Sequence, residues 1–174
     1  MIRIVYYIVF YMLCCLLQFF FGQYLHVRGV FPNFILIAVT YLGLSRGKLN
    51  GEVMGFFLGL TWDIFSTDVF GVRVIIFTII GYLSGSMNKD FDKDNVFTQI
   101  VAVFLANIAY WIGFSLIYYI IPEEGSGSYK PFVITAQGSL KIALTVIIAP
   151  LIFYILNVAE RFGRRHINGM AKRR

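Results

Sequence analysis

Asp63 and Arg73 are the residues with the clearest potential for chemistry, because both stand in a strongly apolar stretch. Asp63 ends the segment GEVMGFFLGLTWD, and the connection from there to Arg73 also contains Asp68. A carboxylate in apolar surroundings is costly unless a partner or water satisfies it. We therefore expect Arg73 to pair with Asp63 or with Asp68. Such a pair could brace a helical hairpin, or it could contact a ligand or a partner protein.

Small residues at helical spacing precede Asp63. Seven glycines occur four residues apart, as the triplet Gly51, Gly55, Gly59 and as the pairs Gly43/Gly47 and Gly81/Gly85. Residues four apart lie on one helical face, and glycine lets a second backbone come close. We expect the pairs and Gly51 to serve helix packing. The triplet either packs against the chain's own helices or lines a groove for a partner's helix.

Pro32 and Asn33 open another apolar segment. Proline suits the first turn of a helix, where its missing N–H costs nothing, so we expect a helix to begin there. Asn33 could donate to or accept from groups near Asp63. The candidates for lining a cavity or contacting a partner helix are therefore Pro32, Asn33, Gly55, Gly59, Asp63, Asp68 and Arg73.

Patterns typical of catalysis or of metal binding are absent from the sequence. Its two histidines, His26 and His166, lie outside the apolar segments, so a Ser–His hydrolase would lack its base. Neither HExxH nor a GxxxxGKS phosphate loop occurs. The acidic loop NKDFDKDN lacks the glycine and the distal glutamate of a calcium site. We predict no catalytic residue, no metal, no cofactor and no enzymatic activity.

The composition indicates which environment holds these residues. Of 174 residues, 59% are hydrophobic and only 14% are charged, against about 25% charged in soluble domains. The net charge is +6, and six of the fifteen cations lie in the last fourteen residues. A nucleic-acid-binding surface would need basic residues over a folded, water-facing surface. We therefore expect an integral membrane protein that contacts lipids and no nucleic acid.

Hydropathy divides the chain into six predicted membrane spans. They cover residues 4–21, 31–45, 51–66, 72–87, 96–121 and 133–158, with a basic tail over 159–174. No linker separates two parts, so residues 1–174 form a single membrane domain in this interpretation. The predicted fold class is an all-α bundle of six transmembrane helices.

Lysine and arginine in the short loops set the orientation. With the N-terminus inside, eleven cations lie on the inner side and four on the outer side. The outer four are Arg28, Arg73, Lys130 and Lys141. Both termini are therefore predicted to be cytoplasmic. Asp63 lies about 18 Å along its helix from Gly51, which places it in the outer half of the membrane.

The run from Pro32 to Gly85 resembles the rod shape-determining protein MreD family. The matching pattern is a proline–Asp/Asn helix start, a basic inner turn, and G-x3-G-F-x2-G-L-x2-D from Gly51 to Asp63. A turn with Gly71 and the motif G-Y-L-x-G, Gly81 to Gly85, complete it. The match covers about a third of the chain in detail. Asn33 stands where the family often has aspartate, so a second outer carboxylate is missing.

The resemblance implies a non-enzymatic component of the bacterial elongation machinery in the cytoplasmic (inner) membrane. It implies work in rod shape and peptidoglycan synthesis with the single-span protein MreC, the filament protein MreB and the RodA–transpeptidase synthase. A homodimer is a further arrangement to consider. The family is also similar in fold to the substrate-binding subunits of energy-coupling-factor vitamin transporters. The alternative function is therefore a membrane subunit that binds a small molecule, with Asp63 and Arg73 as ligand contacts.

Overall fold

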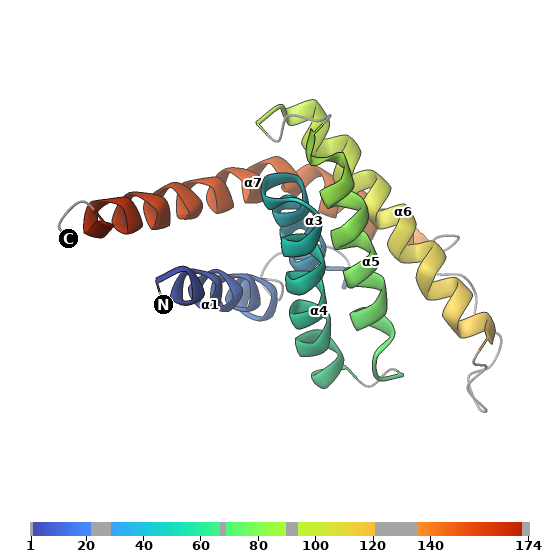
Figure 1. The fold of residues 1–174 in the computed structure, drawn as a ribbon. Coiled ribbons are helices and arrows are strands. Elements are labelled where there is room, and N and C mark those ends of the chain that lie inside the picture. The colour runs from blue at the N-terminus through green and yellow to red at the C-terminus, as the bar shows by residue number, and fades with distance from the viewer. Residues whose placement is uncertain (1, 22–28, 67–68, 90–93, 121–135, 172–174) are drawn as a thin grey trace.

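The computed structural model describes residues 2–21, 29–66, 69–89, 94–120 and 136–171, and these form helices and no β-strand (Figure 1). The α-helices are α1 (Ile2–Leu16), α3 (Phe34–Arg46), α4 (Lys48–Ile64), α5 (Val72–Ser86), α6 (Val96–Ile120) and α7 (Ala136–Ala171). A π-helical turn, η1 (Leu17–Phe21), extends α1, and a short 3-10 helix, η2 (Met87–Lys89), extends α5.

Helix α3 forms the centre of the bundle. Every residue from Phe34 to Leu44 is buried. A helix that is apolar on all sides belongs inside a structure, and α3 indeed packs against α4, α5, α6 and α7. The Tyr41 ring lies between Phe10 of α1 and Phe153 of α7, with ring centroids 6.2 and 5.3 Å away.

The remaining helices surround α3 unevenly. Helices α4 and α5 lie side by side as an antiparallel hairpin, and α6 lies beyond α5 (Figure 1). Helix α1 and the C-terminal part of α7 both extend away from α3, α4 and α5 on the opposite side from α6 (Figure 1). One flank of α4 is consequently covered by α5, whereas the other is only partly covered by α1.

Most observed helices agree with the predicted spans to within three residues, but the sixth is much longer. Helix α7 continues to Ala171, so most of the segment predicted as a tail is helical. Charged residues end a hydropathy signal without ending a helix, because arginine is a good helix former.

Two described helices are long and apolar enough to cross a membrane, namely Val96–Ile117 and Gln137–Arg161. Shorter apolar helices are Ile8–Phe20, Phe34–Arg46 and Val72–Ser86. Helix α4, which carries Lys48, Glu52 and Asp63, is not among them. The all-helical class is thus confirmed for the described residues, while the number of spans and their orientation stay predictions.

Candidate functional site

Asp63 caps a neighbouring helix. It lies at the end of α4, and its Oδ2 accepts hydrogen bonds from the backbone N–H groups of Gly71 (2.9 Å) and Val74 (3.2 Å). Gly71 is the N-cap residue of α5 and has no side chain to perform this role. The first N–H groups of any helix lack intrahelical partners and favour a negative charge. The Asp63 carboxylate therefore satisfies the start of α5 from outside that helix.

Arg73 completes this cluster. Its Nη1 lies 3.3 Å from Asp63 Oδ1 and donates to Ser66 Oγ at 2.7 Å. The guanidinium also lies over the Trp62 and Phe114 rings, 5.9 and 5.6 Å from their centroids, which favours a cation there. Of the two carboxylates that the sequence offers to Arg73, Asp63 is its partner, and Asp68 lies outside the described residues.

Burial defines what the Asp63–Arg73 pair can do. The Asp63 side chain has 0% of its surface exposed and the Arg73 side chain 9%. A ligand or partner would therefore meet very little of either charge. The geometry favours the bracing interpretation, in which the pair ties the end of α4 to the start of α5.

Pro32 and Asn33 precede α3, as expected, but their roles differ from the prediction. Pro32 lies before the helix rather than in its first turn, because Asn33 is the N-cap and α3 begins at Phe34. Asn33 Oδ1 accepts from Leu36 N at 3.0 Å, and Asn33 N donates to Thr145 Oγ1 of α7 at 3.1 Å. Both residues are buried, and Asn33 serves α3 and α7 rather than Asp63.

The glycine triplet of α4 faces α5 of the same chain. A Cβ on Gly55 would collide with the Phe77 carbonyl, and one on Gly59 would lie 2.7 Å from Val74 Cα. Gly51 and Gly81 are in backbone contact across the same interface. The alternative of a groove for a partner's helix along Gly55 and Gly59 therefore does not fit the structure.

The two residues of the Gly43/Gly47 pair lie in different surroundings. Gly43 of α3 packs on α5, since its Cβ would lie 2.8 Å from Gly85 N. Gly47 instead has open space at its Cβ position and a φ of +83°. That backbone conformation strongly favours glycine. Gly47 is thus the turn residue between α3 and α4, and its backbone also lies against α5, since its carbonyl carbon is 2.7 Å from the position that a Cβ on Gly85 would take.

A second ion pair, in which the carboxylate is buried, was missed because this carboxylate falls in the predicted tail. Glu160 of α7 is only 2% exposed. Its Oε1 lies 3.0 Å from Arg46 Nε, and its Oε2 accepts from the Tyr41 hydroxyl at 2.5 Å. The cluster ties α7 to the end of α3. The one sequence signal was that Glu160 is the only acidic residue after Glu124.

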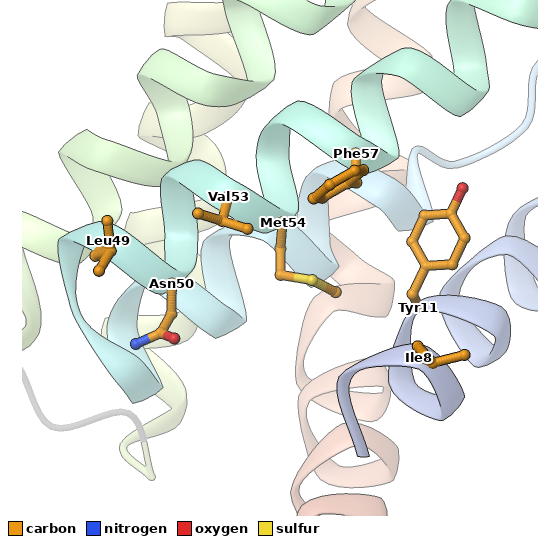
Figure 2. A pocket seen from close by; sticks show the side chains of 7 residues that line it. All are labelled: Ile8, Tyr11, Leu49, Asn50, Val53, Met54 and Phe57. Atoms are coloured by element: carbon orange, nitrogen blue, oxygen red, sulfur yellow. The ribbon is translucent and has the colours of Figure 1, made fainter. Parts of the chain in front are cut away.

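The interface between α1 and α4 contains an open apolar groove of about 440 Å³ (Figure 2). Its lining residues are Ile8, Tyr11, Leu49, Asn50, Val53, Met54 and Phe57. The two polar members are already engaged, because Tyr11 is hydrogen-bonded to Thr61 and Asn50 Nδ2 donates to Arg46 O at 2.8 Å. Met54 points from α4 toward α1 (Figure 2). Neither Gly55 nor Gly59 lines this groove, so sequence spacing did not predict it.

The described residues contain no group of three or more His, Cys, Asp or Glu side chains that could hold a metal ion. Cys14 is buried in the core and Cys15 is partly buried, and both are free thiols. The chemistry that this arrangement supports is packing and recognition of apolar surfaces.

Comparison with protein families gives one decisive match. The model of the family described as rod shape-determining protein MreD covers residues 1–159. The chain belongs to the MreD family. This membership assigns it to rod-shape determination, and the MreD family is a membrane family of the shape-determining system rather than a known enzyme family.

No curated protein and no solved structure matches the chain. The MreD match ends directly before Glu160, so the carboxylate partner of Arg46 lies just outside the matched residues.

Proposed function

We propose that this MreD-family protein is a non-enzymatic scaffold of the cell-elongation machinery in the bacterial cytoplasmic membrane. It forms one domain of six membrane-spanning helices with both termini in the cytoplasm. It binds the transmembrane helix of MreC and links it to MreB filaments and to the RodA–transpeptidase synthase, and so acts in peptidoglycan synthesis. The family match over residues 1–159 carries this proposal. A homodimer is compatible with it.

The groove between α1 and α4 supports a helix as the bound partner. Its walls are apolar, and its polar side chains are occupied by bonds within the chain. Membrane helices associate by close packing of apolar surfaces. The glycine triplet cannot serve this purpose because α5 already covers it. We therefore place the MreC helix on the face of α4 that carries Leu49, Val53 and Phe57.

A small-molecule-binding subunit is the second candidate function. The groove volume of about 440 Å³ falls in the range of small-molecule sites, about 300–1,000 Å³. Such sites also need a few polar groups that orient the ligand. The scaffold is favoured because Asp63 and Arg73, the charges first considered as ligand contacts, are buried against each other.

Copurification separates the two functions. The tagged chain, coexpressed with MreC and solubilised in mild detergent, should retain MreC through size-exclusion chromatography. Mass spectrometry of the same sample should find no stoichiometric metabolite. A tightly bound small molecule together with absence of MreC would overturn the scaffold and favour the transporter-type subunit.

A further inference from the structure

The end of α7 continues beyond the bundle as a helical extension. Helix α7 runs without interruption from Ala136 to Ala171, so the part after Glu160 is about 16 Å long at 1.5 Å per residue. Figure 1 shows this part projecting away from α3, α4 and α5. We call residues 161–171 the basic arm. Because it continues a long helix, its direction is set where α7 leaves the bundle.

The charged side chains of the basic arm are all positive. It contains Arg161, Arg164 and Arg165 and no acidic residue, and the sequence continues with three further cations. The nearest acidic residue is Glu160, whose carboxylate is buried and bound by Arg46 and Tyr41. Glu160 is therefore held by α3 and does not neutralise the arm.

The position of the arm along α7 indicates which class of molecule the arm contacts. The apolar run of α7 ends at Ala159, because Glu160 and Arg161 follow it in the sequence, so an α7 that crosses the membrane would bring the start of the arm to the level of the lipid headgroups. Basic clusters directly beside a membrane helix are attracted to anionic lipids. A soluble polyanion would not require the arm to start at this level.

We propose that the basic arm is a docking site for anionic lipid headgroups and that Glu160 is the residue that fixes its direction. The Glu160–Arg46 ion pair and the Tyr41 hydrogen bond hold α7 against α3 one residue before the arm. The first turns of the arm would then be held at the level of the lipid headgroups, and the contact of the arm with the membrane would depend on lipid charge. This inference rests on the membrane location but not on MreC binding.

The test uses the full chain in nanodiscs, with an environment-sensitive fluorophore on Met170→Cys in a Cys14→Ala, Cys15→Ala background. Discs of phosphatidylcholine alone are compared with discs that also contain phosphatidylglycerol. The emission should shift to the blue only in the anionic discs. The shift should vanish in 1 M salt, where the screening length falls to about 3 Å.

Two sets of variants make the test specific. Replacing Arg161, Arg164 and Arg165 by glutamine should lower the docked-to-free ratio at least about tenfold, since each cation near an anionic surface contributes roughly fivefold. The matched triple lysine variant keeps the charge and should keep the shift. Glu160→Gln, and independently Arg46→Gln, should weaken docking while all three arginines remain.

Several outcomes would overturn the proposal. Equal emission in both kinds of disc would exclude lipid docking, as would a shift that survives in the triple glutamine variant. A shift that requires added nucleic acid or an acidic protein would assign the arm to that partner instead. Unchanged docking in folded Glu160→Gln and Arg46→Gln proteins would remove the direction-fixing role. Because no MreC is present, these results are independent of the scaffold function.

Discussion

A single carboxylate, Asp63, performs two structural roles in this protein. It caps α5 through Gly71 N and Val74 N, and it neutralises Arg73 in a buried position. Both roles follow from the same physical need, because helix N-termini and buried cations each favour a nearby negative charge. The burial and bonding of Asp63 thus favour a role in the stability of the α4–α5 hairpin.

Removing Asp63 should therefore destabilise the protein strongly. Asp63→Ala leaves a buried cation and an uncapped helix, which should cost about 3–5 kcal/mol of unfolding free energy. Asp63→Asn keeps shape and an acceptor oxygen and should cost less. The double variant Asp63→Ala, Arg73→Ala should recover part of the loss, as expected for coupled residues. Unfolding in detergent, followed by circular dichroism, measures all three.

Additive losses in this cycle would show that the two charges do not stabilise each other. A stable Asp63→Ala protein that no longer supports rod shape would instead assign Asp63 to a partner or ligand. That result would restore the functional interpretation of the pair.

The sequence predicted some residue-level features and missed others for identifiable reasons. Asp63 and Arg73 stand out because they are charges in apolar segments ten positions apart. Glu160 does not stand out in this way, since it adjoins Arg161, and adjacent charged residues usually lie in solvent. Gln18 does not stand out either. Its Oε1 accepts from Phe34 N at 2.8 Å, and this bond between η1 and α3 exists only because tertiary packing brings the two segments together.

At the level of elements, the α4–α5 interface is a direct contact between two helix backbones. Gly51, Gly55 and Gly59 of α4 meet the backbone of α5 directly. The four-residue spacing predicted this class of contact, because only glycine allows it at such short range. Spacing could not decide whether α5 or another protein would be the neighbour, since that depends on how the hairpin closes.

Gly55→Ala should lower the unfolding free energy by about 1–3 kcal/mol, the usual cost of overpacking. The added methyl would collide with the Phe77 carbonyl, which belongs to a helix backbone and cannot move alone. Gly113→Ala is the matched control, because its Cβ would lie 3.1 Å from the Ile76 side chain, which can adjust. Thermal unfolding of both variants measures the difference, and equal stability would contradict the packing account.

The opposite flank of α4 tests the proposed partner site. Val53→Trp should fill part of the α1–α4 groove and reduce copurification of MreC about tenfold. Ile79→Trp is a suitable control, since Ile79 is 51% exposed on α5 and does not line the groove. The protein yield should stay unchanged in both. Normal MreC recovery with Val53→Trp would place the partner helix elsewhere.

For the whole molecule, hydropathy predicted an all-helical bundle because a helix satisfies its own backbone polar groups, as an apolar segment in lipid must. It could not give the arrangement, in which α3 is buried on all sides while α1 and the end of α7 extend from the core. Both features depend on packing between segments far apart in sequence. The family match then supplied the function that composition alone could not.

The orientation is testable with a reporter enzyme that is active only in the periplasm. Fused after Arg174, it should stay inactive, because eleven cations lie on the predicted inner side and four on the outer side. The same reporter fused after Gly125 should be active, since α7 lies between these two positions. Activity after Arg174 would reverse the orientation of the entire bundle.

Helix α4 is the most informative predicted span for such fusions, because it carries three charges. Its 17 residues reach about 26 Å, slightly less than the hydrocarbon core of about 30 Å. Lys48 and Glu52 lie at its first turns, and Asp63 at its last turn is paired with Arg73. No unpaired charge therefore lies at mid-depth, and we expect α4 to cross the membrane. Fusions after Gly47 should be inactive and those after Ser66 active, whereas equal activities would show that α4 does not span.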